Sequence, residues 1–195
     1  MLIENEFEVA APVEKVWAYL LDVPRLAPCL PGAELVGDDG DGAYQGKVTA
    51  KLGPVSLRFA GTAKIVEADE AARRIVMDAS GSEEKGKGTA SMTVTSVLAP
   101  AGRGTTVKVA QDLQVSGAAA QYGRGMIADV TSVIMTSFAQ CLQANIDAEG
   151  RGEAATAGAR PVSAAPVGGV GVGLRAALLG LKRVFRRFFG AYTRP

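Results

Sequence analysis

The most constraining feature of this chain is a long run of alternating segments between residues 33 and 115. Apolar and polar residues alternate in segments 43–52 and 55–66, and again in the segments up to residue 115. This period is typical of half-buried antiparallel strands, and turns rich in Gly or polar residues separate the segments. Residues 1–9 alternate in the same way. The pattern predicts one curved antiparallel sheet of about seven strands.

Two helices are predicted beside these strands. Residues 13–21 have apolar side chains at helical spacing and follow Pro12, a residue favoured at the start of a helix. Residues 118–148 change to a period of 3.6, which predicts a long helix with one apolar face. The simplest fold that is compatible with this order of elements is an α+β domain spanning residues 1–148. In it the curved sheet grips the long helix and leaves a tapered apolar cavity between them.

The predicted cavity is expected to open near the turns around residues 25–32. Its lining follows from the inward phase of the strands and from the apolar face of the long helix. Each of these side chains also suits an ordinary core, whereas the methionines as a group suit an adaptable pocket. The residues predicted to bind a ligand are Leu26, Leu30, Tyr44, Val48, Phe59, Met77, Met92, Met126, Val130 and Ile134.

The C-terminal part of the chain differs from the rest in composition and charge. Residues 149–173 are rich in Gly, Ala and Pro, which predicts a flexible linker. Residues 151–195 contain eight Lys or Arg and one acidic residue, whereas residues 1–150 contain 13 basic and 19 acidic residues. This asymmetry favours a tail that seeks an acidic surface.

Residues 174–195 predict a basic amphipathic helix that lies on an anionic membrane surface. A transmembrane span is excluded because each cation would cost ~2.5–3.5 kcal/mol at the bilayer centre. Docking of this helix into a partner's groove stays open as an alternative, and a nucleic-acid partner is a poor fit to an acidic domain. The predicted membrane-binding residues are Leu178, Leu181, Lys182, Arg183, Phe185, Arg186, Arg187, Phe188 and Phe189.

Several chemistries are excluded or disfavoured by composition. The chain has no histidine, which rules out a histidine base and an imidazole zinc site. Cys29 and Cys141 match no metal spacing, and Cys29 is expected to be a small packing residue in a reducing compartment. Asp112 and Asp129 are the only candidates for paired carboxylates. No nucleotide-binding glycine motif occurs, so we expect no catalytic residue, no metal and no covalent cofactor.

Three segments resemble the G-subunit family of carbon monoxide dehydrogenase, within the START-like (SRPBCC) helix-grip superfamily. They are ENEFEVAAPVEKVWAYLLDVPRLAPCLPGAE at the start, YQGKVTAKLGPVSLRFAGTAKI in the strands, and DLQVSGAAAQYGRG before the long helix. The resemblance covers residues 1–148. It implies an accessory protein of a molybdenum hydroxylase, with an apolar ligand cavity and no family catalytic residues.

Tail, cavity and resemblance together favour a non-enzymatic carrier at the cytoplasmic face of the cell membrane. We expect it to bind a hydrophobic molecule, a membrane quinone, and to link the molybdenum-containing carbon monoxide dehydrogenase to the respiratory chain. The alternatives are an enzyme similar to polyketide cyclases or aromatases, which would need polar groups in the pocket, and an assembly chaperone of the dehydrogenase that binds no ligand.

Overall fold

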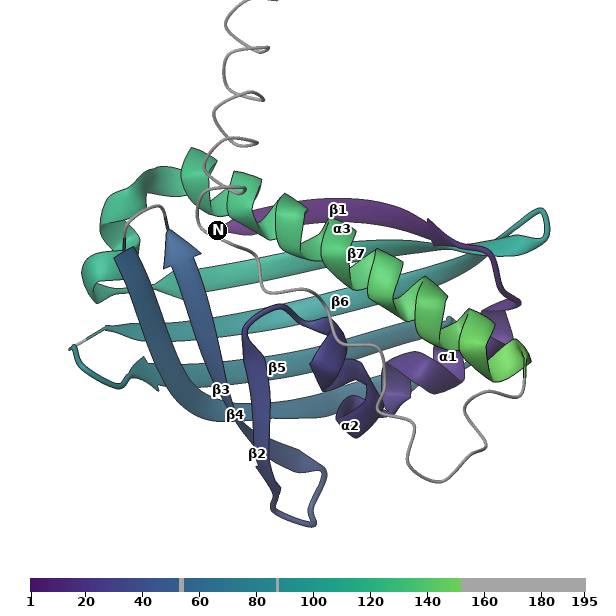
Figure 1. Cartoon of the computed structure of the whole chain (residues 1–195), viewed down its shortest axis with the longest axis horizontal. Helices are drawn as coiled ribbons and strands as arrows, with labels where there is room; N and C mark the ends of the chain where they lie inside the picture. The colour runs from purple at the N-terminus through teal and green to yellow at the C-terminus, as the bar shows by residue number, and fades with distance from the viewer. Residues whose placement is uncertain (53–54, 87, 152–195) are drawn as a thin grey trace, which may run out of the picture.

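A computed structural model describes residues 1–52, 55–86 and 88–151 of the chain. Seven antiparallel strands form one sheet in the order β1-β7-β6-β5-β4-β3-β2, which confirms the predicted architecture (Figure 1). Consecutive strands from β2 to β7 are neighbours, and β1 pairs with β7. The strands are β1 (Leu2–Val9), β2 (Ala33–Asp38), β3 (Ala43–Leu52), β4 (Val55–Asp69), β5 (Arg74–Glu83), β6 (Thr89–Ala101) and β7 (Gly104–Val115).

Helices occur at two places in the chain, between β1 and β2 and after β7. Between β1 and β2 lie α1 (Val13–Leu21), α2 (Val23–Leu26) and the 3-10 turn η1 (Ala27–Cys29). After β7 come the 3-10 turn η2 (Gly117–Tyr122) and the long helix α3 (Gly123–Gly150). As predicted, α1 begins directly after Pro12.

The long helix begins later and ends later than the prediction of residues 118–148. Gly123 has a φ of +69°, a conformation that favours glycine, and it separates η2 from the regular helix. At the other end, the Arg25 guanidinium forms an ion pair with the carboxylate of Glu149. Glu149 and Gly150, the first two residues of the predicted linker, belong to α3 in the structure.

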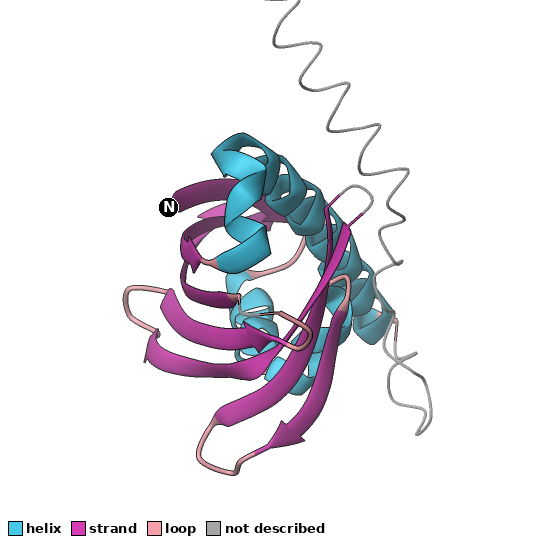
Figure 2. Cartoon of the chain, turned by 90° about the vertical axis from the view of Figure 1, so that its left-hand side faces the viewer, coloured by secondary structure: helices cyan, strands magenta, loops and turns pink. Residues whose placement is uncertain are grey.

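The sheet curls around α3, which runs across its concave face (Figure 2). Bulges between Ile65 and Glu67 in β4 and between Leu35 and Gly37 in β2 interrupt the regular pairing. Such irregularities bend strands and increase their twist. The curvature leaves room between the sheet and the helix.

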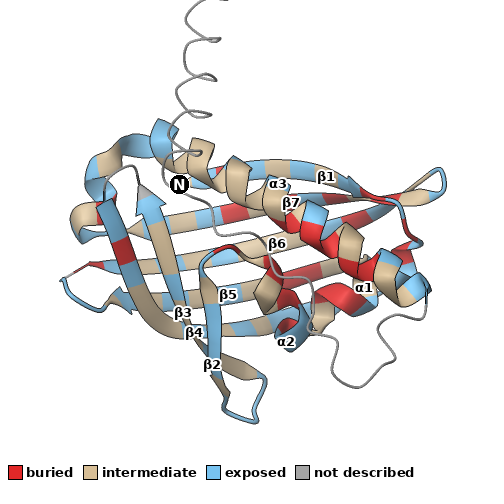
Figure 3. Ribbon diagram, viewed as in Figure 1, coloured by how far each residue is buried: buried red, intermediate tan, exposed pale blue. Residues whose placement is uncertain are grey.

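Packing is tight at only one end of α3. Buried residues gather where its C-terminal half meets α1, β1 and β7 (Figure 3). Phe138 packs edge-to-face on Phe7 with ring centroids 5.8 Å apart, and Leu142 and Val16 are fully buried. No residue between Gly123 and Met135 is buried to the same degree. The core therefore anchors one half of the helix and leaves the other half over a cavity.

Candidate ligand-binding site

A cavity of about 420 Å³ lies between the concave face of the sheet, α3 and the α2–η1 segment. Such a volume is within the range of small-molecule sites. Two apolar clusters lie on either side of it: the main core beside α1, and a smaller cluster around Leu57 and Ala119 beneath η2. The cavity thus lies between two parts of the apolar core of the domain.

Nine of the ten residues predicted to bind a ligand lie in the wall of this cavity. They are Leu26, Leu30, Tyr44, Val48, Phe59, Met77, Met92, Val130 and Ile134. Their contact with a ligand stays a prediction.

Met126 is the exception, because it lies outside the cavity wall and is 45% exposed. One residue along the helix turns a side chain by about 100°, and here Ile127 faces the cavity in place of Met126. The inward face continues through Thr131 and Met135, so it is rotated relative to the predicted face.

Small residues on the inner face of the sheet explain why side chains do not fill the cavity. Gly46, Gly61 and Gly81 pair with one another across β3, β4 and β5, and all three line the cavity. A Cβ atom on Gly61 would lie 1.9 Å from the Ser80 carbonyl oxygen, so only glycine fits there. The predicted lining contained large apolar residues alone and lacked this contribution of small ones.

The cavity reaches solvent along β2 and β3, where the lining residues Leu35 and Val48 are 38% and 47% exposed. The segment of residues 25–32, near which the opening was predicted, forms part of the wall through Leu26, Ala27 and Leu30.

Charged side chains occur only at this outer part of the described lining. They are Glu34, which is exposed, and Lys47, whose ammonium lies 3.0 Å from the carboxylate of Glu84. Hydrogen bonding from Lys47, aided by its charge, lowers the pKa of Glu84. The interior of the cavity is left apolar, with the exception of a few uncharged polar groups.

One of these polar groups is deeply buried. Gln111 on β7 lines the cavity and is 5% exposed, and its Nε2 atom has no hydrogen-bond partner within the described part of the chain. Gln111 is not among the residues predicted from the sequence. A polar residue in the inward phase of β7, between Val109 and Leu113, was the available signal.

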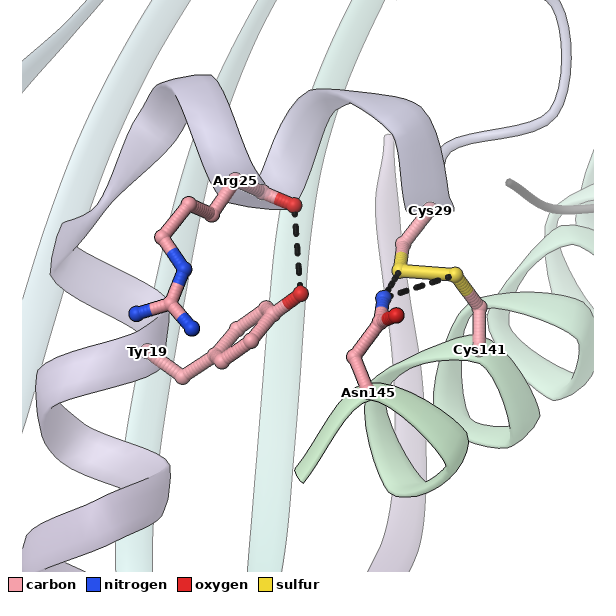
Figure 4. Close-up of a disulfide and its surroundings, with 5 residues drawn as sticks. All are labelled: Tyr19, Arg25, Cys29, Cys141 and Asn145. Atoms are coloured by element: carbon pink, nitrogen blue, oxygen red, sulfur yellow. Dashed lines mark hydrogen bonds between the residues drawn. A yellow bond between two sulfur atoms is a disulfide. The ribbon is translucent and has the colours of Figure 1, made fainter. Parts of the chain in front are cut away.

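The two cysteines form a disulfide, which was not predicted from the sequence (Figure 4). Cys29 in η1 and Cys141 in α3 are 112 residues apart, and their Cα atoms are 5.4 Å apart. The fold brings η1 onto α3, a contact that spacing in the sequence cannot reveal. Asn145 donates from Nδ2 to both sulfur atoms, at 3.2 Å to Cys29 and 3.5 Å to Cys141. Cys29 is fully buried, as expected of a small packing residue, but it is one half of a disulfide that the sequence did not predict.

Beside the disulfide, Tyr19 and Arg25 fix the turn between α1 and η1. The Tyr19 hydroxyl donates to the carbonyl oxygen of Arg25 at 3.3 Å, and the Arg25 guanidinium lies 4.9 Å from the centre of the Tyr19 ring (Figure 4). Burial raises the pKa of Tyr19, against the opposing effect of the Arg25 charge. These contacts stabilise the cavity wall that α2 and η1 provide.

Asp112 and Asp129, the candidates for a carboxylate pair, do not line the cavity. Asp112 is exposed and accepts a hydrogen bond from the N-terminal ammonium at 3.1 Å. No cluster of three potential metal ligands occurs among the residues that the structure describes.

The linker after residue 151 and the predicted membrane-binding residues of the tail lie outside the described residues. Within the described part, the segment Gly117–Gly150 contains an 18-residue window with a mean hydropathy of 1.3, so by length and composition it could cross a bilayer. Its apolar face meets the cavity and the sheet, which accounts for this composition.

The fold and the cavity define a START-like helix-grip domain. The chain is similar in structure to a START superfamily protein from Mycobacterium smegmatis, with a TM-score of 0.52, 16% identity, and coverage of 75% of this chain and 97% of that one. A conserved protein from Geobacillus kaustophilus gives a TM-score of 0.65, with 19% identity over 75% of this chain and 95% of that one. The Zhui aromatase/cyclase from a Streptomyces species gives 0.55, with 16% identity over 78% and 97%. At such identities the likeness establishes the fold alone.

The family is established by the sequence. The family model of the carbon monoxide dehydrogenase G subunit (CoxG) matches residues 6–147, and the chain belongs to this family. The chain is thus a member of a family of accessory proteins, and membership implies association with carbon monoxide dehydrogenase. No curated protein matches the chain.

Proposed function

We propose that this protein carries a hydrophobic small molecule, a membrane quinone, between the membrane and a molybdenum hydroxylase of the carbon monoxide dehydrogenase type. The observation that carries the proposal is the apolar cavity of about 420 Å³ beneath the N-terminal half of α3. A quinone is nearly insoluble in water, so an enzyme that is not embedded in the membrane needs a carrier or an anchor to reach it.

The proposed contact with the membrane rests on the sequence of residues 174–195. A helix with Phe185, Phe188 and Phe189 on one side and a row of Lys and Arg on the other suits the cytoplasmic surface of an anionic membrane. In this proposal residues 152–173 are the tether between the carrier domain and the tail. The tail recruits the dehydrogenase to the membrane, delivers quinone to it, or does both.

A cytoplasmic location must be compatible with the disulfide. Thiol reductants attack a disulfide only when they can reach a sulfur atom. Cys29 is 0% and Cys141 is 5% exposed, so the bond is shielded from such attack in the folded domain. Burial thus supports a disulfide that persists at the cytoplasmic face.

The cavity favours a carrier over an enzyme similar to the aromatases. A cyclase must move protons, and this requires titratable groups beside the substrate. Among the described lining residues the titratable groups are Glu34 and Lys47, both at the outer part, and the phenol of Tyr44, and Lys47 is already paired with Glu84. No carboxylate or ammonium lies in the interior of the described lining. An assembly chaperone without a ligand would need no such cavity.

Extraction of the bound ligand tests the proposal. The full chain is purified without organic solvent from cells that contain quinones, and a solvent extract is analysed by mass spectrometry. A stoichiometric quinone supports the carrier, and an Ile134→Trp variant is the matched control because it fills the cavity. If the extract of the wild-type protein contains no apolar compound beyond that of the variant, the carrier function is rejected in favour of the chaperone.

A further inference from the structure

The side-chain amide of Gln111 offers a buried, unpartnered hydrogen-bond donor in the cavity wall. Along β7 the same inward face continues to Val109 on one side and Leu113 on the other. In the neighbouring strands the residues paired with Gln111 are Ile3 of β1 and Val94 of β6. The amide therefore has apolar neighbours in both directions along the sheet.

Burying an amide without a partner is unfavourable, and a leucine of similar shape would avoid the penalty. The other side chain with an unpartnered buried nitrogen in the described residues is Asn5, whose Oδ1 accepts from Ser132 at 3.3 Å and which does not line the cavity. The Thr131 hydroxyl does line the cavity, but it donates to the Ile127 carbonyl at 2.9 Å. Gln111 thus combines burial, an unused donor and a position in the cavity wall.

We propose that Gln111 determines which ligand the cavity takes, by donating a hydrogen bond from Nε2 to a carbonyl oxygen of an otherwise apolar, ring-containing molecule. The inference rests on the proposed carrier function and names the residue that recognises the ligand's oxygen. A carbonyl oxygen is the right complement because the amide nitrogen only donates. A hydrocarbon of the same shape would fill the cavity but leave the amide unpaired, and a site with a buried donor discriminates against such an analogue.

Two probes that share a carbon skeleton, one with two carbonyl groups and one without oxygen, test this assignment. They are 2-methyl-1,4-naphthoquinone and 2-methylnaphthalene, titrated against the full-length protein freed of bound lipid, with tryptophan fluorescence or calorimetry as the readout. The wild-type protein should bind the quinone more tightly than the hydrocarbon. In Gln111→Leu the affinity for the quinone should fall about tenfold, whereas that for the hydrocarbon should stay equal or rise.

The matched control is Gln114→Leu, the same substitution at a glutamine of β7 that does not line the cavity. Gln114 is exposed, so its replacement should leave the preference for the quinone unchanged. Thermal unfolding of Gln111→Leu confirms that the variant is folded, and its Tm should not fall because the substitution removes a buried unpaired group.

The results of these titrations separate the two proposals. If the wild-type protein binds both probes but Gln111→Leu keeps the full preference for the quinone, the role of Gln111 is refuted and the carrier function stands. If the wild-type protein binds neither probe, the carrier function fails, and the assignment of Gln111 fails with it. A preference lost equally in Gln114→Leu would also overturn the assignment.

Discussion

Breaking the Cys29–Cys141 disulfide should destabilise the domain and loosen one wall of its cavity. The bond joins η1 to the C-terminal half of α3, and the adjoining residues Leu26 and Leu30 line the cavity. Two substitutions, Cys29→Ala with Cys141→Ala, remove the bond and leave small apolar side chains in its place. Reduction of the wild-type protein in denaturant, where both sulfur atoms are accessible, and refolding in the presence of reductant remove it without a change of sequence.

The expected magnitude follows from the length of chain that the bond closes. A separation of 112 residues corresponds to about 4.8 kcal/mol of lost chain entropy in the unfolded state at 25 °C. Measured losses for native disulfides are roughly 2–5 kcal/mol, which brackets this value. For a domain of this size each kcal/mol lowers Tm by roughly 2–4 °C, so the full loss lowers it by about 10–20 °C.

Thermal unfolding of the full chain, followed by circular dichroism with and without a phosphine reductant, measures this effect. The wild-type Tm should fall on reduction to near that of the double variant, whose own Tm should not respond to the reductant. Affinity for a quinone probe should fall in parallel because the α2–η1 wall is no longer tied to α3. Two free thiols in the denatured, unreduced wild-type protein would refute the reasoning, as would an unchanged Tm of the protein that has been reduced in denaturant and refolded in reductant.

Three further outcomes are expected. Ile134→Trp should abolish ligand uptake in a binding titration, while Met126→Trp should leave it unchanged because Met126 lies outside the cavity wall; equal losses would refute the position of the wall. Because burial raises the Tyr19 pKa above its ordinary value of 10.0, the stabilisation is present below pH 10 and lost as the pH rises through the folded-state pKa. Tyr19→Phe should therefore flatten the fall of Tm above pH 10, and an unchanged slope would contradict this. Deleting residues 174–195 should abolish sedimentation with anionic vesicles and preserve Tm; undiminished sedimentation would place the membrane contact elsewhere.

Local patterns predicted most of the fold because its elements carry their own periodicity. The alternation in 43–52 matches β3 residue for residue, and Val13–Leu21 is helical over the predicted range. The start of α3 was missed because the turn at Gly123 depends on a positive φ, which composition alone does not specify. The rotation of the helix that removes Met126 from the cavity is likewise set by tertiary packing.

Features that depend on contacts between distant elements were not predictable from one sequence. The disulfide requires η1 to lie on α3, and nothing in the spacing of Cys29 and Cys141 encodes this approach. The role of Gly61 depends on the Ser80 carbonyl of the neighbouring strand. Among the missed residues, Gln111 could most easily have been predicted, since its inward orientation follows from the alternation of β7.

The uneven packing of α3 explains how a stable domain can keep a cavity of this size. An unfilled apolar cavity is unfavourable because the atoms that line it lose packing contacts. Here the C-terminal half of the helix offsets that cost through the disulfide, the Phe7–Phe138 contact and the buried Leu142. The N-terminal half then covers the cavity, and a bound ligand would supply the packing contacts that this half lacks. Ligand binding should accordingly stabilise the first turns of α3 more than the last, because the first turns are the less tightly packed in the free protein.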